Sequence, residues 1–190
     1  MKKPKTFYST QGDQGFTEIG GGVRVPKDAL QVEACGAVHE LNSLLGLAIS
    51  LGVSPELIPI LLQIQSDLFY LSEELSYTSN PEKNQKIATI ESRHVKALEK
   101  HIESLTEALD SLEGRIVPGG SLPASVLHLA RSVCWRVERR AVSLLRQWEE
   151  DSRYVLKYLN RLSDLMFIMA RFQNRQDGLS ETEWPGKGRM

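Results

Sequence analysis

Residues 123–148 read PASVLHLARSVCWRVERRAVSLLRQW, and this stretch decides the fold that we expect. Apolar residues recur in it at steps of three and four for more than about six helical turns. Side chains with that spacing lie along one face of an α-helix, so the stretch predicts a long helix with one buried side. The apolar positions are Val126, Leu129, Val133, Val137, Ala141, Leu144 and Trp148.

The same periodicity extends in both directions and predicts four more helices. Their expected bounds are Asp28 to about Gly52, Ser54 to Leu75, Ile90 to Leu112 and Asp151 to Phe172. Ser54 is expected to cap the second of these helices, with Pro55 in its first position. No strand pattern interrupts the series, which therefore predicts an all-α, five-helix bundle over residues 28–173. Residues 1–27 form a glycine-rich loop in this prediction, and residues 174–190 form a disordered tail.

Composition limits the classes of function. The formal net charge is -1, which argues against a nucleic-acid partner, because phosphate backbones are bound by a surplus of Lys and Arg. No apolar run approaches the ~20 residues of a membrane span, and the basic start lacks the apolar stretch of a secretory signal. We therefore expect a cytoplasmic protein without a membrane partner. Cys35 and Cys134 have no metal-binding neighbourhood and are interpreted as core residues.

The first candidate site is the loop YSTQGDQGFT at residues 8–17. Gly12 and Gly15 flank Asp13 and Gln14, and glycines at this spacing let backbone N–H groups turn toward one point. Such a loop can hold a phosphate group. The same residues also occur in ordinary turns, so both interpretations stay open at this point.

The second candidate site lies on the long helix of residues 123–148. It holds four arginines and one glutamate within ten residues, namely Arg131, Arg136, Glu138, Arg139 and Arg140. Arg131, Trp135 and Glu138 share one face of the helix, because Trp135 and Glu138 follow Arg131 by four and seven residues. Arginines present a fork of donors that suits phosphate, although a solvated charged face is the alternative.

The third candidate site is YLNRLSD at residues 158–164. Asn160, Ser163 and Asp164 lie on adjoining turns of a helix that is otherwise apolar. Buried polar groups need hydrogen-bond partners. These residues are therefore either internally bonded or in contact with a ligand.

Further motifs accompany these three clusters. They are RVPKD at residues 24–28, CGAVHELN at 35–42, PGG at 118–120, HLAR at 128–131, WRVER at 135–139 and YLNRLSDLMF at 158–167. In this order the motifs resemble the PduO-type ATP:cob(I)alamin adenosyltransferases, whose pattern is TKTGDxGTT, RVxKDD, YGxxDELN, PGG, HxAR, RRxER and YLNRLSDLLF. The resemblance spans about Phe7 to Phe172, and the last two motifs are the most specific.

The resemblance implies a homotrimer of five-helix subunits with active sites between neighbours. The implied activity is transfer of the 5′-deoxyadenosyl group of ATP to Co(I) of cobalamin or a related corrinoid, with release of triphosphate. ATP, with Mg²⁺, would be bound by Gly12, Asp13, Gly15, Thr17, Lys27, Arg136, Glu138, Arg139 and Asn160. The corrinoid would lie near His39, Arg115, Arg131, Trp135 and Phe167, and the implied catalytic residues are Arg131 and Arg136.

The chain departs from the family pattern at four working places. Thr10 and Gln11 replace the lysine and threonine of the loop, so the phosphate cradle loses a positive charge. His39 replaces the aspartate that in the family pairs with the arginine corresponding to Arg131. Trp135 replaces the first arginine of RRxER, and Arg115 replaces an aromatic residue before the PGG turn.

These departures leave two hypotheses open. The first is a corrinoid adenosyltransferase that retains its activity with a slower transfer step, since each lost charge-assisted contact removes ~2–4 kcal/mol of transition-state stabilisation. The second is a repurposed member that carries or senses a corrinoid, another tetrapyrrole or a nucleotide. His39 is either a metal ligand or a hydrogen-bonded bundle residue, and Trp135 either stacks on a flat ligand or fills space.

Overall fold

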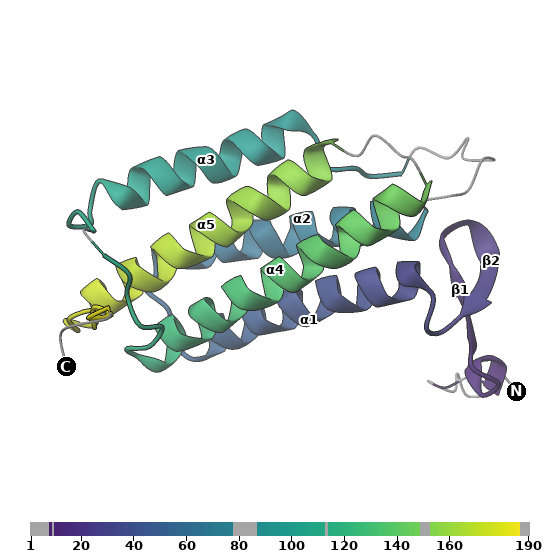
Figure 1. Cartoon of the computed structure of the whole chain (residues 1–190), viewed down its shortest axis with the longest axis horizontal. Helices are drawn as coiled ribbons and strands as arrows, with labels where there is room; N and C mark the ends of the chain where they lie inside the picture. The colour runs from purple at the N-terminus through teal and green to yellow at the C-terminus, as the bar shows by residue number, and fades with distance from the viewer. Residues whose placement is uncertain (1–7, 9, 78–86, 113, 149–152, 187–190) are drawn as a thin grey trace, which may run out of the picture.

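The described residues contain five α-helices, as the sequence predicts. The computed structural model describes residues 8, 10–77, 87–112, 114–148 and 153–186. The helices run side by side and form an all-α bundle (Figure 1). Their bounds are α1 Leu30–Ser50, α2 Ile58–Ser76, α3 Ser92–Thr106, α4 Leu122–Trp148 and α5 Arg153–Gln176. Among the described residues, no helix combines the length and the apolar character that crossing a membrane requires.

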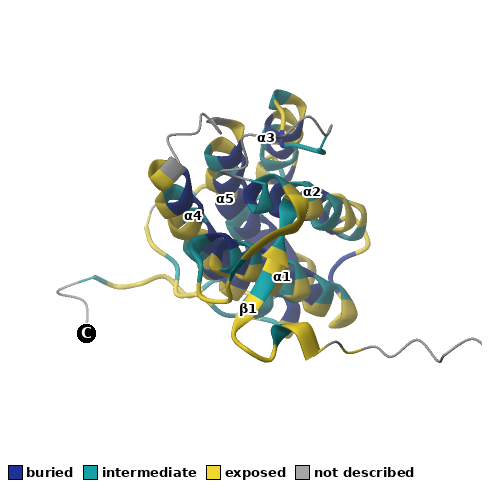
Figure 2. Cartoon of the chain, turned by 90° about the vertical axis from the view of Figure 1, so that its right-hand side faces the viewer, coloured by how far each residue is buried: buried dark blue, intermediate teal, exposed yellow. Residues whose placement is uncertain are grey.

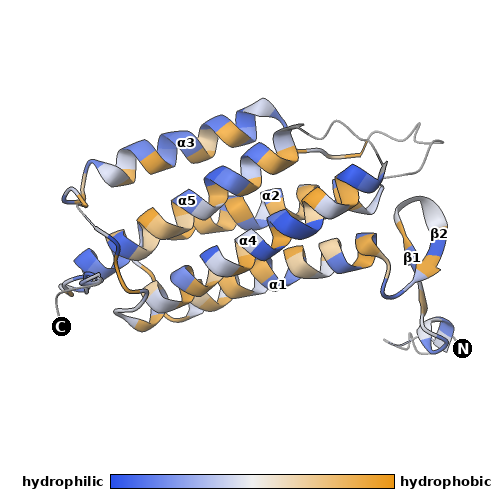
Figure 3. Ribbon diagram, in the orientation of Figure 1, coloured by the Kyte–Doolittle hydropathy of each residue, from blue (hydrophilic) through white to orange (hydrophobic). Residues whose placement is uncertain are grey.

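The packing order of the helices differs from their order in the chain. Helix α1 packs against α2 and α4, α4 also packs against α5, and α5 packs against α3. Leu41 and Leu45 of α1, Val137 of α4 and Leu162 of α5 are fully buried, so the apolar stripes meet in one core. Apolar and hydrophilic residues accordingly alternate along every helix (Figure 3). Burial of these stripes supplies most of the stability of such a bundle.

One buried polar contact ties α5 to α2 inside this core. Tyr158 donates a hydrogen bond of 3.0 Å from its hydroxyl to Asp67, which also accepts a bond of 2.8 Å from Gln63. Burial, and then the charge of Asp67, raise the pKa of the Tyr158 hydroxyl, which stays protonated and able to donate. The cysteines are free thiols, with Cys134 buried and Cys35 half-buried.

A small β-hairpin precedes the bundle and was not predicted. Strands β1 Phe16–Ile19 and β2 Val23–Pro26 are antiparallel, with Phe16 opposite Pro26. Gly21 and Gly22 make the turn with φ values of 79° and 74°, a conformation that favours glycine. The hairpin lies beside the amino-terminal end of α1, and most of its residues are exposed (Figure 2). Each strand is only four residues long, too short to produce a clear alternation in the sequence.

The predicted start of the second helix and the predicted end of the third are wrong, and both errors have a tertiary cause. Helix α2 begins at Ile58 rather than after Ser54, because the backbone N–H and the hydroxyl of Ser54 both donate to Gln173 of α5, at 2.7 and 3.0 Å. Helix α3 ends at Thr106 rather than Leu112. Beyond that end, the carbonyl of Asp110 accepts a hydrogen bond from Arg171, also of α5.

The expectation of a disordered tail from residue 174 is wrong for the part that the structure describes. Helix α5 continues to Gln176, and Asn174 is buried. The following segment, residues 177–186, runs back along the loop before α4. There Val117 donates to Thr182 at 2.8 Å, and Trp184 donates to Arg115 at 2.7 Å. Residues 187–190 of the predicted tail lie outside the described residues.

Candidate functional site

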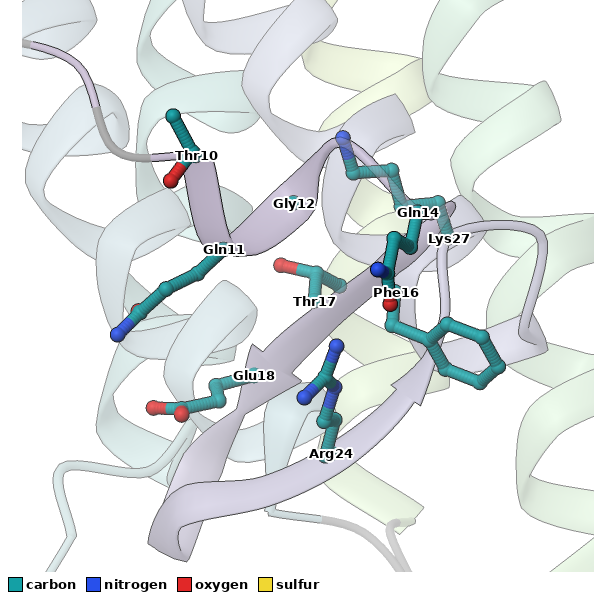
Figure 4. A pocket seen from close by; sticks show the side chains of 9 residues that line it. All are labelled: Thr10, Gln11, Gly12, Gln14, Phe16, Thr17, Glu18, Arg24 and Lys27. Atoms are coloured by element: carbon teal, nitrogen blue, oxygen red, sulfur yellow. The ribbon is translucent and has the colours of Figure 1, made fainter.

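The amino-terminal loop and the hairpin enclose a cavity of about 550 Å³ (Figure 4). Every residue of its lining comes from residues 10–27, so a single short segment builds it. The lining residues are Thr10, Gln11, Gly12, Gln14, Phe16, Thr17, Glu18, Arg24 and Lys27. The cavity therefore joins three of the predicted ATP-binding residues, Gly12, Thr17 and Lys27.

Two glycines shape this loop. Gly15 has a φ of 81°, and its carbonyl accepts a 2.9 Å hydrogen bond from the backbone N–H of Lys27. This bond closes the loop onto the end of β2. A Cβ atom on Gly12 would lie 3.0 Å from Nζ of Lys27, so the missing side chain lets the ammonium group approach the loop backbone. Asp13, between the two glycines, is exposed.

Six lining residues were not among the predicted site residues, and two of these six, Arg24 and Glu18, carry charge. They lie opposite each other in the hairpin, Glu18 on β1 and Arg24 on β2. The guanidinium of Arg24 lies 5.4 Å from the ring centre of Phe16, and Figure 4 shows it pointing into the cavity beside Thr17. The motif RVPKD could have indicated Arg24 as a site residue, because Arg24 and Lys27 stand three residues apart in it. The loop thus has two cations facing its cavity.

A second cavity, of about 630 Å³, lies between the hairpin and helices α1 and α2. His39 lines it, and the ring Nε2 atom of His39 is hydrogen-bonded to the hydroxyl of Ser72 at 3.1 Å. The edge of the ring also packs against Phe69, with ring centres 6.5 Å apart. His39 therefore makes the bundle hydrogen bond that was one of the two sequence interpretations.

Arg131 lies on another face of the bundle, between α4 and α5. Its guanidinium carbon is 4.6 Å from the ring centre of Trp135 and 4.4 Å from that of Phe167. Burial lowers the pKa of Arg131, and the charge of Asp164 acts in the opposite direction. Within the described residues, the Nε atom of Arg131 is buried and has no hydrogen-bond partner. The expected pairing of position 39 with Arg131 is therefore not made within one chain, because His39 contacts α2 and Arg131 contacts α5.

Two other arginines of α4, Arg136 and Arg140, pair with carboxylates of α1. Arg136 forms an ion pair with Glu40, and Arg140 forms one with Glu33 at 2.8 Å. Each pair is roughly half exposed, so it keeps both partners accessible to a stronger anion. Arg139 is exposed and Glu138 is half-buried. The arginine cluster is thus divided between two faces of the helix.

The remaining predicted residues lie at separate places. Asn160 is exposed on α5, where its side-chain oxygen accepts a 2.9 Å bond from Arg161 and its carbonyl accepts a 2.8 Å bond from Ser163. Arg115 lies in the loop before α4, and its guanidinium carbon is 5.8 Å from the ring centre of Trp184. The structure therefore brings the loop residues into one group, and Arg131, Trp135 and Phe167 into another.

This fold and these motifs define a family of group-transfer enzymes. The family model for Cobalamin adenosyltransferase matches residues 7–173, and the chain belongs to that family. Among its relatives is the Corrinoid adenosyltransferase of Bacillus subtilis (strain 168), 42% identical over 182 residues that cover 94% of this chain and 91% of the relative. The Cobalamin adenosyltransferase of Cupriavidus metallidurans is 40% identical, with 91% and 90% covered.

Solved structures agree with the family assignment. One is a variant of the PduO-type ATP:corrinoid adenosyltransferase from Lactobacillus reuteri, complexed with cobalamin and ATP. It superposes on this chain with a TM-score of 0.88 at 33% identity, covering 95% of this chain and 100% of that chain. The similarity therefore includes the amino-terminal loop as well as the bundle.

Proposed function

We propose that the protein is a corrinoid adenosyltransferase, which transfers the 5′-deoxyadenosyl group of ATP to Co(I) of cobalamin and releases triphosphate. The observation that carries the proposal is the loop cavity, where the ammonium of Lys27 and the guanidinium of Arg24 face backbone shaped by Gly12 and Gly15. Two cations in the lining of one cavity suit a polyphosphate. The names of the relatives, and the cobalamin and ATP bound to a solved relative, support the same function.

The loop would bind the triphosphate and its metal. Lys27 and Arg24 would contact phosphate oxygens, with Thr17 as a hydroxyl donor. Mg²⁺ is usually held by one or two carboxylates together with substrate phosphates. Glu18 in the cavity lining and the exposed Asp13 of the loop are the carboxylates that we propose for this role.

The chemistry requires positioning more than proton transfer. Co(I) is a strong nucleophile, so the protein needs no general base to activate it. It must hold the 5′ carbon of ATP in line with the cobalt and stabilise the charge that develops on the leaving triphosphate. Cations of the loop and of α4 would supply that stabilisation, and Arg131 and Arg136 are the proposed catalytic residues.

We further propose that the complete site forms between two copies of the chain in a homotrimer. The lining of the loop cavity comes from residues 10–27 alone, whereas Arg136, Glu138, Arg139 and Asn160 lie on α4 and α5. A neighbouring subunit that presents α4 and α5 to the loop would unite the two groups. The same arrangement would bring His39 of one subunit to Arg131 of another. The cytoplasmic location stays a prediction.

The alternative function is a carrier or sensor of a corrinoid, another tetrapyrrole or a nucleotide. The departures at Thr10, Gln11, His39 and Trp135 favour it, because Thr10 and Trp135 each stand where the family pattern has a cation. Arg24 opposes it, because the structure places a second cation at the loop after all. On this balance, we retain transfer as the proposed function.

Isothermal titration calorimetry separates the two functions at the level of binding. A transferase should bind Mg²⁺–ATP both with and without cobalamin, and Lys27→Gln should raise the dissociation constant of Mg²⁺–ATP. A carrier or sensor of a corrinoid should bind cobalamin while showing no measurable binding of ATP. The second result would reject the proposed ATP site.

A further inference from the structure

Trp135 and Phe167 hold the guanidinium of Arg131 from two helices. Trp135 lies one turn beyond Arg131 on α4, and Phe167 lies on α5. The guanidinium carbon is 4.6 Å from the first ring centre and 4.4 Å from the second. Both distances are well inside the ~6 Å within which a cation is attracted to a ring. The guanidinium is therefore in contact with two aromatic rings at once.

Among the described residues, no carboxylate forms an ion pair or a hydrogen bond with Arg131. Asp164 is near enough to raise the pKa of Arg131, but within the described residues the buried Nε of Arg131 has no hydrogen-bond partner. His39, which stands where the family has an aspartate, bonds to Ser72 and packs on Phe69. The contacts that fix the orientation of Arg131 are thus aromatic.

We infer that Trp135 is a positioning residue, which acts on the transfer reaction by holding Arg131 between its own ring and that of Phe167. The inference rests on the proposed function and gives Trp135 a role other than direct contact with a substrate. A guanidinium is planar and stacks well on aromatic faces. Rings packed on it restrict its donors to the remaining directions, toward an anionic group presented from outside the chain.

This role explains why a tryptophan can replace an arginine here. An arginine at position 135 would place a second cation one helical turn from Arg131, where like charges repel. Such a pair needs a nearby carboxylate, and position 39 supplies none in this chain. Tryptophan removes the repulsion and is the best cation–π partner among the side chains. The changes at positions 39 and 135 are thus complementary.

The kinetic test compares Trp135→Leu with Trp135→Phe in single-turnover adenosylation. Trp135→Leu should lower the rate constant by about tenfold or more, with the ATP dissociation constant changed less than about threefold. Trp135→Phe keeps a ring and should retain the rate within about threefold. Tyr154→Leu is the matched control, because it removes another cation–π pair, with Lys157 at 5.8 Å, from an exposed place on α5.

A double-mutant cycle with Arg131→Gln separates positioning from direct contact. If Trp135 acts through Arg131, then Trp135→Leu should change the rate by less than about twofold once the guanidinium is gone. An equal loss in both backgrounds would mean that Trp135 contacts a substrate itself, and would overturn the inference. Failure of Trp135→Phe to restore the rate would overturn it as well.

A spectroscopic measurement tests the stack without relying on activity. The ring currents of Trp135 and Phe167 should displace the Nε–H proton resonance of Arg131 from the ordinary arginine position in the NMR spectrum. The displacement should persist in Trp135→Phe and shrink in Trp135→Leu. An undisplaced resonance in the wild-type protein would overturn the inference. If the wild-type protein forms no adenosylcobalamin, the proposed function is rejected, but the NMR test of the Arg131 stack still holds.

Discussion

The Nε atom of Arg171 donates to both carboxylate oxygens of Glu181, at 3.0 and 2.9 Å. Arg171 lies on α5 with its side chain 8% exposed, and Glu181 belongs to the segment that follows the helix. A second donor of Arg171, Nη2, bonds to the carbonyl of Asp110 beyond α3. One nearly buried cation therefore joins the carboxyl-terminal segment to the end of α3.

We expect Glu181→Ala to destabilise the protein by about 2–4 kcal/mol, because it leaves the guanidinium of Arg171 buried without its counter-charge. Urea unfolding followed by circular dichroism measures the change. The control is Glu99→Ala, which breaks the Glu99–Arg161 pair at a distance of 3.1 Å with both side chains 41% exposed. That loss should be at most about 1 kcal/mol. Equal effects of the two changes would contradict the importance of burial.

Gly120→Ala should destabilise the loop before α4 by about 2 kcal/mol or more. Gly120 has a φ of 107°, and a Cβ atom there would lie 2.0 Å from the side-chain oxygen of Asn174. That oxygen accepts the backbone N–H of Ser121 at 3.0 Å, so the clash would also break this contact. Gly119→Ala is the neighbouring control, since a Cβ atom there meets nothing within 4 Å. A thermal unfolding midpoint that falls equally in both variants would refute this prediction.

The loop cavity predicts how ATP affinity depends on charge. Lys27→Gln and Arg24→Gln should each raise the dissociation constant of Mg²⁺–ATP about ten- to hundredfold, the equivalent of ~1.5–3 kcal/mol for a hydrogen bond to a charged group. Calorimetry measures the constants, and unfolding curves should stay unchanged because both side chains are exposed. Lys157→Gln, an exposed lysine of α5, serves as the control. An effect of Lys27→Gln alone would exclude Arg24 from phosphate binding.

Stability should decrease in mild acid through His128. Burial, and then the charge of Arg131, lower the pKa of the His128 ring. The folded protein therefore binds fewer protons at this site than the unfolded chain does, and the free energy of unfolding falls as the pH drops below ~6.5 toward the folded pKa. His128→Gln should flatten this part of the curve, measured by urea unfolding between about pH 7.5 and 5.5. An unchanged slope would remove His128 from the explanation.

The sequence predicted the helices well because apolar periodicity reports burial directly. It misplaced the start of α2 and the end of α3 because distant side chains decide both: Gln173 takes the capping group of Ser54, and Arg171 takes the carbonyl of Asp110. The segment after Gln176 looked disordered because its order comes from the Arg171–Glu181 pair and from backbone bonds to residues 115–117. Local composition carries no signal of such contacts.

The sequence likewise indicated only a part of the candidate site. The family resemblance implied Gly12, Thr17 and Lys27 as ATP-binding residues, and all three line the loop cavity. Arg24 was missed because its position depends on a hairpin that was not expected. The relation of Arg131 to Trp135 follows from their four-residue spacing, but the second ring, Phe167, comes from another helix and needed the structure.

Formation of adenosylcobalamin tests the central claim most directly. The protein is incubated with Mg²⁺–ATP and cob(I)alamin under anaerobic reducing conditions, and the light-sensitive product is followed by its absorption spectrum. We expect product to form with release of triphosphate, and the rate to fall in Lys27→Gln. A rate equal to that of the enzyme-free control, in protein that binds both ATP and cobalamin, would contradict the assignment of transferase activity to this chain.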